Sequence, residues 1–184
     1  ELQAWLASGV LRRLDRSFSR DTGDGRYVQD LVAAAVDDLR DWVARGAAIY
    51  VWASGQVYIQ TNYFSANAAT LNGVVVYLGG AANVYLRRNE FRGNTADADG
   101  GGLAASGNLK IVSAEDVFES NLARRDGGAV ALSVNGREAS FSLGRFLDNT
   151  ATRDGGGFLA DRASLLINRG DSERSRAGRN GGFV

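Results

Sequence analysis

Residues 118–130 read FESNLARRDGGAV, and this stretch decides the fold because its pattern recurs along the chain. A Phe recurs at intervals of 27, 27 and 28 residues, at Phe64, Phe91, Phe118 and Phe146. Three residues after each Phe stands an Asn, at Asn67, Asn94, Asn121 and Asn149. Nine residues after each Phe stands a Gly, at Gly73, Gly100, Gly127 and Gly155. A fixed period of this length is typical of solenoid proteins.

A fifth copy keeps the register although it has lost the Phe and the Asn. Ser172 and Ser175 occupy those two places, and Gly181 follows at the turn. Helical repeats need units of about 33 to 47 residues, whereas these units hold short apolar runs bounded by Gly and Asn, such as Val84 to Leu86. A unit of 27 residues suits one coil of a parallel β-helix, with three strands and three turns. The sequence therefore predicts a mainly β fold, a parallel β-helix solenoid of about five coils.

Stacking of successive coils turns each recurring position into a ladder, because equivalent residues then lie about 4.8 Å apart. We expect the Phe ladder to stack inside the core, where aromatic rings bury large areas. The Asn ladder is expected to form amide-to-amide hydrogen bonds along the axis. The Gly ladder marks corners that require a positive φ or leave no room for a side chain.

The chain before residue 47 has a helical rather than a strand-like pattern. One apolar stripe consists of Leu2, Trp5, Leu6, Val10, Leu11, Leu14 and Phe18, and a second of Val28, Leu31, Val32, Ala35, Leu39, Trp42 and Val43. Gly46 is placed to end the second helix. We expect residues 1–46 to form amphipathic helices that cap the solenoid of residues 47–184; a membrane-binding or partner-binding role for them stays open.

The C-terminal end of the solenoid has no comparable covering element in the sequence. Unpaired strand edges invite association with another chain. We therefore expect the native polypeptide to continue with more coils beyond residue 184, or to self-associate through this end.

The tetrads Phe118-x-x-Asn121 and Gly127-Gly128-Ala129-Val130 resemble the FxxN and GGA(I/L/V) tetrads of the polymorphic outer-membrane-protein repeats, found in chlamydial autotransporter adhesins and other large surface proteins. Neighbouring copies are looser and replace Ala by Gly. The resemblance covers roughly residues 64–184. It implies a right-handed parallel β-helix of pectin-lyase-like type, exported and displayed at a cell surface as an adhesive passenger.

Composition removes several kinds of chemistry. The 184 residues include no Cys and no His, so disulfides, zinc clusters and cysteine or histidine catalysis are excluded. We expect no cofactor. The 21 Lys and Arg balance 21 Asp and Glu, which argues against nucleic-acid binding. The longest nearly uncharged stretch, residues 73–86, is shorter than the ~20 residues of a membrane span.

Carboxylates recur just before the Gly of the turn, at Asp99, Asp126 and Asp154. Arginines directly precede Asp126, Asp154 and Asn180 in successive coils. They are Arg125, Arg153 and Arg179, the candidate partner-binding residues. The pattern favours a surface seam of capped turns. A Ca²⁺ or glycan contact by the Asp residues, and catalysis by them, stay open as alternatives. Catalysis is disfavoured because an active site needs different residues converging at one place.

Six aromatic residues gather in the first two coils: Tyr50, Trp52, Tyr58, Tyr63, Tyr77 and Tyr85. Their flat amphipathic rings suit a sugar-stacking platform. The favoured interpretation places them in the core and at the junction with the predicted helices.

These observations favour a non-catalytic structural or adhesive scaffold, located outside the cell or at its surface, whose partner is a protein or a glycan. A carbohydrate-active lyase or hydrolase is the first alternative. A structural component of a filamentous assembly is the second.

Overall fold

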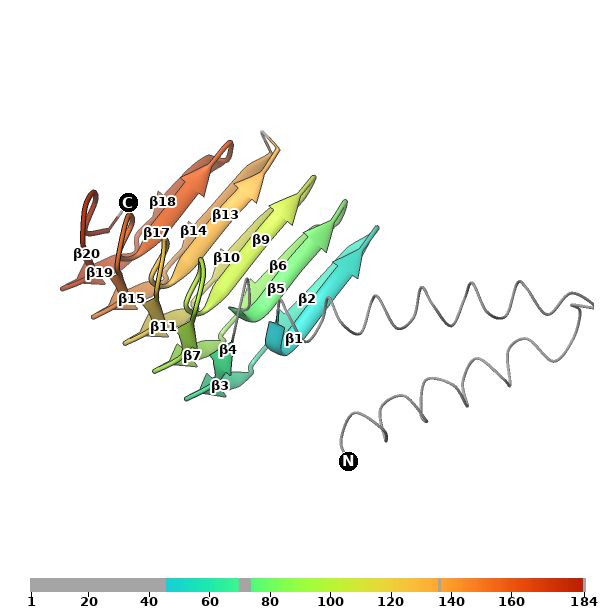
Figure 1. The fold of residues 1–184 in the computed structure, drawn as a ribbon. Coiled ribbons are helices and arrows are strands. Elements are labelled where there is room, and N and C mark those ends of the chain that lie inside the picture. The colour runs from blue at the N-terminus through green and yellow to red at the C-terminus, as the bar shows by residue number, and fades with distance from the viewer. Residues whose placement is uncertain (1–45, 70–73, 136, 184) are drawn as a thin grey trace, which may run out of the picture. The chain divides into compact units, whose positions relative to one another are not determined.

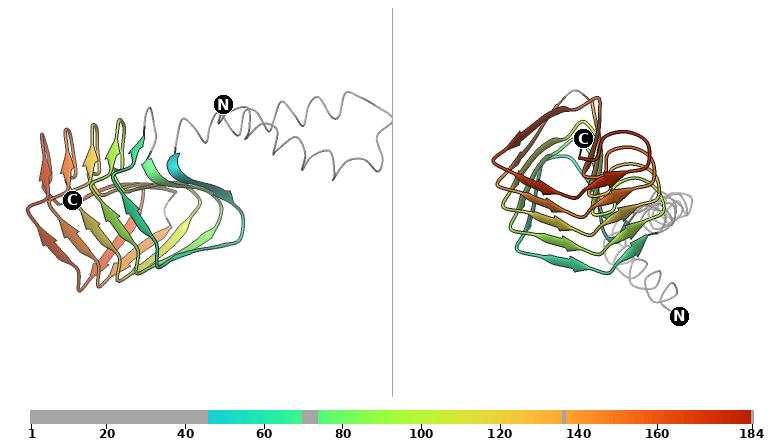
Figure 2. Two further views of the ribbon diagram at one scale, coloured as in Figure 1. Left: turned by 90° about the horizontal axis from the view of Figure 1, so that it is seen from below. Right: turned by 90° about the vertical axis from the view of Figure 1, so that its left-hand side faces the viewer.

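The computed structural model describes residues 46–69, 74–135 and 137–183, all of which belong to one compact unit, Ala44–Val184. Within these ranges there are strands and no helix. The strands form four parallel five-stranded sheets, and every coil contributes one strand to each sheet (Figure 1). Figure 2 shows the coils following one another along a single axis. The prediction of a mainly β parallel solenoid of about five coils is confirmed.

Each sheet is named here by a letter. Sheet A contains β1 (Gly46–Ala53), β5 (Val74–Gly80), β9 (Leu103–Gly107), β13 (Val130–Val134) and β17 (Phe158–Asp161). Sheet B contains β2 (Gln56–Gln60), β6 (Asn83–Arg87), β10 (Lys110–Ala114), β14 (Glu138–Ser142) and β18 (Ser164–Asn168). Sheet C contains β3 (Tyr63–Ser65), β7 (Glu90–Arg92), β11 (Val117–Glu119), β15 (Arg145–Leu147) and β19 (Asp171–Glu173). Sheet D contains β4 (Ala68–Ala69), β8 (Thr95–Ala96), β12 (Leu122–Ala123), β16 (Thr150–Ala151) and β20 (Arg176–Ala177).

Each coil has four strands instead of the three predicted. The third apolar run divides into a strand of three residues and a strand of two, as in β11 and β12. A left-handed residue causes the division: Ser120, with φ 55°, stands between these strands, directly before Asn121. The chain therefore bends inward at each Asn.

The core is built around the predicted Phe ladder. Phe91, Phe118 and Phe146 are fully buried and Phe64 nearly so. Their ring centroids lie 4.9, 4.5 and 5.1 Å apart in succession, with interplanar angles of 18° or less. Strand pairing holds these distances because Phe91 is in register with Phe118, and Phe118 with Phe146.

The Asn side chains form a continuous hydrogen-bonded ladder. The Nδ2 of Asn94 donates to Oδ1 of Asn121 at 2.9 Å, and that of Asn121 to Oδ1 of Asn149 at 3.0 Å. Each Nδ2 also donates to a Phe carbonyl of the preceding coil. Both amide groups are thereby satisfied inside the bend, as buried polar groups require.

The corner glycines have the backbone conformation that their recurrence predicts. Gly100, Gly127, Gly155 and Gly181 have φ between 63° and 74°, a region that residues with a Cβ rarely adopt. Gly73 lies outside the described residues.

The predicted helical cap over residues 1–46 also lies outside the described residues, except for Gly46. Gly46 is the first residue of β1, and the helix that it was expected to end is not among the described residues. Among the described residues, no helix is long and apolar enough to cross a membrane.

The last coil is the most exposed part of the described solenoid. Ser172, which replaces the Phe, is exposed, and Ser175, which replaces the Asn, is half-buried. Leu165, Ile167 and Phe183 pack against the core but are only partly buried, since the described structure places a coil on one side of them only.

Candidate functional site

The predicted Asp and Arg residues lie together in one seam along the axis. Each arginine pairs with the aspartate of the preceding coil, not with its own neighbour in sequence. Arg125 Nε lies 3.3 Å from Asp99 Oδ1, Arg153 NH2 2.7 Å from Asp126 Oδ2, and Arg179 NH2 2.6 Å from Asp154 Oδ2. The guanidinium groups offset the repulsion expected between stacked carboxylates.

The seam is also tied to the backbone. Asp99 Oδ1 accepts a hydrogen bond from the backbone N–H of Asp126 at 3.1 Å, and Asp126 Oδ1 accepts one from that of Asp154 at 3.0 Å. These carboxylates therefore join successive coils.

Asp126 is the most enclosed member of the seam, with 7% of its side chain exposed. Arg153 binds it through two nitrogens, since Nε donates to Oδ1 at 3.1 Å and NH2 to Oδ2 at 2.7 Å. A paired fork of this kind is the strongest form of arginine–carboxylate contact.

Asp154 ends the column of carboxylates. Burial acts to raise its pKa, but the hydrogen bond from Asn180 and the charge of Arg179 outweigh this, so the pKa of Asp154 lies below its usual value. Asn180 Nδ2 donates to Asp154 Oδ1 at 2.9 Å, and Arg179 donates to Oδ2. The carboxylate of Asp154 therefore stays ionised, and both of its oxygens accept hydrogen bonds.

The geometry of the seam does not suit a metal ion. A Ca²⁺ site gathers six to eight oxygen ligands. No group of three or more His, Cys, Asp or Glu side chains that could hold a metal ion occurs in the described ranges. Each coil contributes one carboxylate to the seam, and each carboxylate already accepts hydrogen bonds from Arg or N–H donors. The residues present therefore do not fit a Ca²⁺ ion.

Asp126→Asn is expected to lower the free energy of unfolding by about 1 to 2 kcal/mol, because it removes the charge and one acceptor of a carboxylate whose side chain is only 7% exposed. Urea unfolding followed by circular dichroism measures the change. Asp97→Asn is the matched control, since Asp97 and its partner Arg124 are 40% and 66% exposed and such pairs contribute about 0.5 kcal/mol. Equal losses in the two variants would show that the seam does not hold the coils together.

A second polar ladder was not predicted, although its residues also recur at intervals of 27: Asn62, Asn89 and Asp116. Asn62 Nδ2 donates to Asn89 Oδ1 at 3.1 Å, and Asn89 Nδ2 donates to Asp116 Oδ1 at 2.9 Å. The spacing was a usable signal. The ladder ends at Asp116, because the equivalent position in the next coil is Gly144.

Asp116 is a fully buried carboxyl group at the end of this ladder. Burial raises its pKa, while hydrogen bonds from Ser113 and Asn89 act in the opposite direction. Ser113 Oγ donates to Asp116 Oδ2 at 2.5 Å. The negative charge of Glu115 also acts to raise this pKa.

The raised pKa of Asp116 sets the sign of a pH effect. Between the unfolded-state pKa, about 3.9, and the higher folded-state pKa, the native chain binds more protons than the unfolded chain. Stability from this group is therefore full below the lower value and falls as pH rises through the higher one.

Asp116→Asn is expected to remove this decline and to raise stability at neutral pH. The free energy of unfolding is measured from pH 3 to 8 for the variant and the parent. The difference between the two curves gives the contribution of Asp116 apart from that of the other carboxylates. Asp171→Asn, an exposed carboxylate on β19, serves as the control. A difference curve for Asp116→Asn that is flat over this range would contradict the assignment.

The aromatic residues do not form one platform and are not in the core. Tyr50 stacks on Tyr77 with centroids 5.2 Å apart on sheet A, and Tyr58 stacks on Tyr85 at 5.0 Å on sheet B. Tyr58 is 60% exposed. Trp52 and Tyr63 are 62% and 63% exposed. Strand alternation explains this outcome on β1 and β2, because the sequence neighbours of Trp52 and Tyr58 pack in or against the core.

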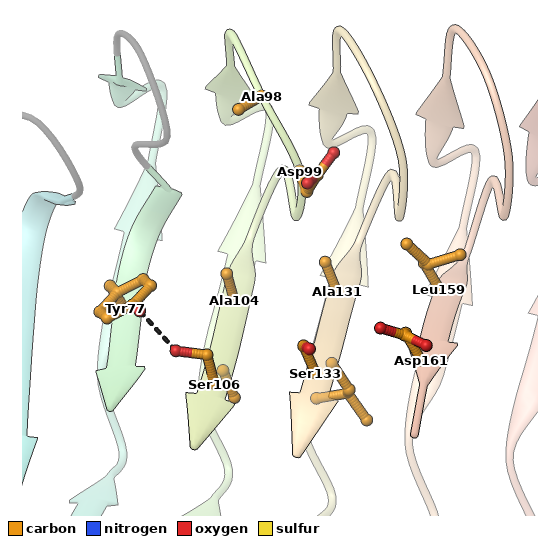
Figure 3. Close-up of a pocket in the computed structure, with 11 residues that line it drawn as sticks. Tyr77, Ala98, Asp99, Ala104, Ser106, Ala131, Ser133, Leu159 and Asp161 are labelled. Carbon is orange, nitrogen blue, oxygen red and sulfur yellow. Dashed lines mark hydrogen bonds between the residues drawn. The ribbon is translucent and has the colours of Figure 1, made fainter. Parts of the chain in front are cut away.

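An open groove of about 250 Å³ lies on the outer face of sheet A. Figure 3 shows Tyr77 at one end, Ala104 and Ala131 in the middle and Leu159 at the other end. Its polar residues are Asp99, Ser106, Ser133 and Asp161. Asp99 comes from the loop between sheets D and A, so the groove joins the seam to the sheet.

Comparison with known proteins does not assign the chain to a family. No family model matches it, and no solved structure matches it. A segment of 51 residues, 28% of the chain, is 43% identical to the sulfite reductase [NADPH] flavoprotein alpha-component of Bacillus subtilis (strain 168). The corresponding proteins of Yersinia enterocolitica and Vibrio parahaemolyticus are 41% and 45% identical over the same length. The chain spans 8% of the length of these relatives.

Proposed function

We propose that the chain is a non-catalytic scaffold of a surface-displayed repeat protein, which binds a protein or a glycan outside the cell. One observation carries the proposal: the repeated carboxylates are occupied by donors from the next coil. Asp126 and Asp154 each accept hydrogen bonds from an arginine and from a further donor. Groups that hold coils together in this way are poorly suited to act as acid and base.

The tetrads FxxN and GGA(I/L/V) supply a second support. In this proposal the chain is a polymorphic outer-membrane-protein repeat with the right-handed, pectin-lyase-like form of the β-helix. The parallel ladders agree with such a scaffold, since every coil fixes the next by backbone and side-chain hydrogen bonds. A rigid surface of this kind loses little conformational entropy when it binds a partner.

Binding to intact cells and to extracellular matrix tests the proposal. Saturable retention of the labelled chain, with no change in the bound material, is the expected result. A variant in which Arg125, Arg153 and Arg179 are all replaced by Gln tests their role as partner-binding residues and is expected to be retained less. These arginines are 46%, 43% and 57% exposed. Absence of saturable retention on every surface would contradict the proposal.

The groove on sheet A favours a second candidate, a polysaccharide lyase or hydrolase. Such an enzyme would release unsaturated or reducing sugars from polysaccharides, and changing Asp99 or Asp161, the two carboxylates that line the groove, would abolish the release. The scaffold proposal expects no release from neutral or acidic polysaccharides. Release that survives both substitutions would place catalysis elsewhere on the chain.

The exposed last coil favours a third candidate, self-association through the C-terminal end. Leu165, Ile167 and Phe183 are partly buried core residues there. Sedimentation of the 184-residue chain is expected to show a concentration-dependent dimer that Leu165→Asp abolishes. A monomer at all concentrations would remove the third candidate and leave the adhesive proposal unchanged.

A further inference from the structure

We propose that the groove on sheet A binds one neutral pyranose ring of a glycan, with the apolar face of the sugar against Tyr77. The inference rests on the proposed function, because it names the partner class of a binding scaffold. It also fixes the position of the contact on the molecule. The groove lies outside the buried Phe and Asn ladders, and Asp99 is the residue that it shares with the seam.

The row of side chains that crosses the groove changes in size along the axis. Strand register places the following residues side by side: Tyr50, Tyr77, Ala104, Ala131 and Leu159. Two aromatic residues are thus followed by two alanines and then by a leucine. The alanines form the floor, and the larger side chains form the two ends (Figure 3).

The ring of Tyr77 is held in place before any ligand arrives. It stacks on Tyr50 with an interplanar angle of 6°. Its hydroxyl group shares a hydrogen bond of 2.5 Å with Ser106 Oγ on the next strand (Figure 3). A fixed ring reduces the entropy lost on binding.

The dimensions of the groove suit a sugar ring. Tyr77 and Leu159 lie on strands three spacings apart, or about 14 Å. The volume of about 250 Å³ accommodates one ring above Ala104. A pyranose ring has an apolar C–H face, and aromatic rings favour such flat, offset contacts. The sugar would thereby occupy the next position of the aromatic row.

The polar groups at the border of the groove favour a ligand that donates hydrogen bonds. Asp99 and Asp161 supply carboxylate oxygens, and Ser133 supplies a hydroxyl group. Sugar hydroxyl groups match these acceptors.

The negative charge of the groove favours a neutral ligand over an acidic one. Two carboxylates and no Lys or Arg line the groove. Arg125 and Arg162 approach from outside, but each pairs with one of these carboxylates, at 3.3 and 3.2 Å. Arg162 also donates to Ser133 Oγ at 3.1 Å. A uronate would meet carboxylates without an available counter-charge, which disfavours acidic polysaccharides.

Isothermal titration of the 184-residue chain with three neutral hexasaccharides, cellohexaose, maltohexaose and hexa-N-acetylchitohexaose, tests the inference. Hexagalacturonate is the acidic probe. At least one neutral probe is expected to bind, and Tyr77→Ala is expected to weaken it roughly tenfold or more. Ala104→Leu, which fills the floor, is expected to do the same; Leu159 shows that this row accepts a leucine. Tyr58→Ala on sheet B is the matched control and is expected to bind normally.

Each other result overturns the inference. Neutral binding that neither Tyr77→Ala nor Ala104→Leu weakens would place the sugar elsewhere. Tighter binding of hexagalacturonate would contradict the charge assignment. No binding of any probe, combined with retention on cells stripped of glycans, would make the partner a protein and leave the scaffold function intact. Loss of retention on all cells and matrix would instead contradict the proposed function itself.

Discussion

Asn121→Leu is expected to lower the free energy of unfolding by about 3 kcal/mol or more, since buried donors and acceptors left unpaired cost about 1 to 3 kcal/mol each. Asn121 Oδ1 accepts from the backbone N–H and from Nδ2 of Asn94, at 3.2 and 2.9 Å. Its own Nδ2 donates to the carbonyl of Phe91 and to Asn149, at 2.9 and 3.0 Å. Leucine has a similar volume but makes none of these bonds.

Urea unfolding followed by circular dichroism measures this loss. Asn67→Leu is the matched control, because Asn67 is only half-buried and begins the described ladder. It donates to Asn94 at 3.0 Å. A loss of about 1 kcal/mol is expected there. Equal effects at the two positions would show that the inward amide ladder does not stabilise the solenoid.

Gly128→Ala is the second substitution with a large expected effect, a loss of about 3 kcal/mol or more from overpacking. A Cβ at this position would meet the carbonyl oxygen of Gly156 and would lie 2.6 and 2.7 Å from the backbone C and N of Thr150. Backbone atoms of the next coil cannot move aside without breaking the pairing of β12 with β16. The two coils would therefore have to separate locally.

Gly93→Ala separates this steric effect from a conformational one. Gly93 has φ 61°, and a Cβ there would meet nothing within 4 Å. Only the cost of a left-handed Ala applies, about 1 kcal/mol. Thermal or urea unfolding compares the two variants, and a Gly128→Ala chain as stable as Gly93→Ala would contradict the close approach of the coils.

The sequence predicts the ladders because residues that stack in successive coils share one environment, so the same residue type recurs at the length of one coil. Phe118 and Asn121 have equivalents in neighbouring coils, so the period alone indicates which residues meet. The ladder that ends at Asp116 escaped prediction because Gly144 interrupts it. The division of the third apolar run into two strands also escaped prediction, since Ser120 has no composition signal for a positive φ.

The groove depends on features that a repeat pattern does not contain. Strand alternation places Tyr77 outward between the buried Val76 and Leu78, and this part could be read from the sequence. The position of Asp99 beside the groove could not be predicted from the sequence. It depends on how the loop between β8 and β9 lies against the outer face of sheet A. The hydrogen bond between the hydroxyl groups of Tyr77 and Ser106 depends in the same way on register.

Binding without turnover is the central claim, and one measurement tests it most directly. The chain is incubated with neutral and acidic oligosaccharides, the retained material is recovered, and its mass is determined. The account predicts that neutral oligosaccharides are retained with unchanged mass and that acidic ones are neither retained nor altered. Shortened or unsaturated sugars that appear with the folded chain would contradict it.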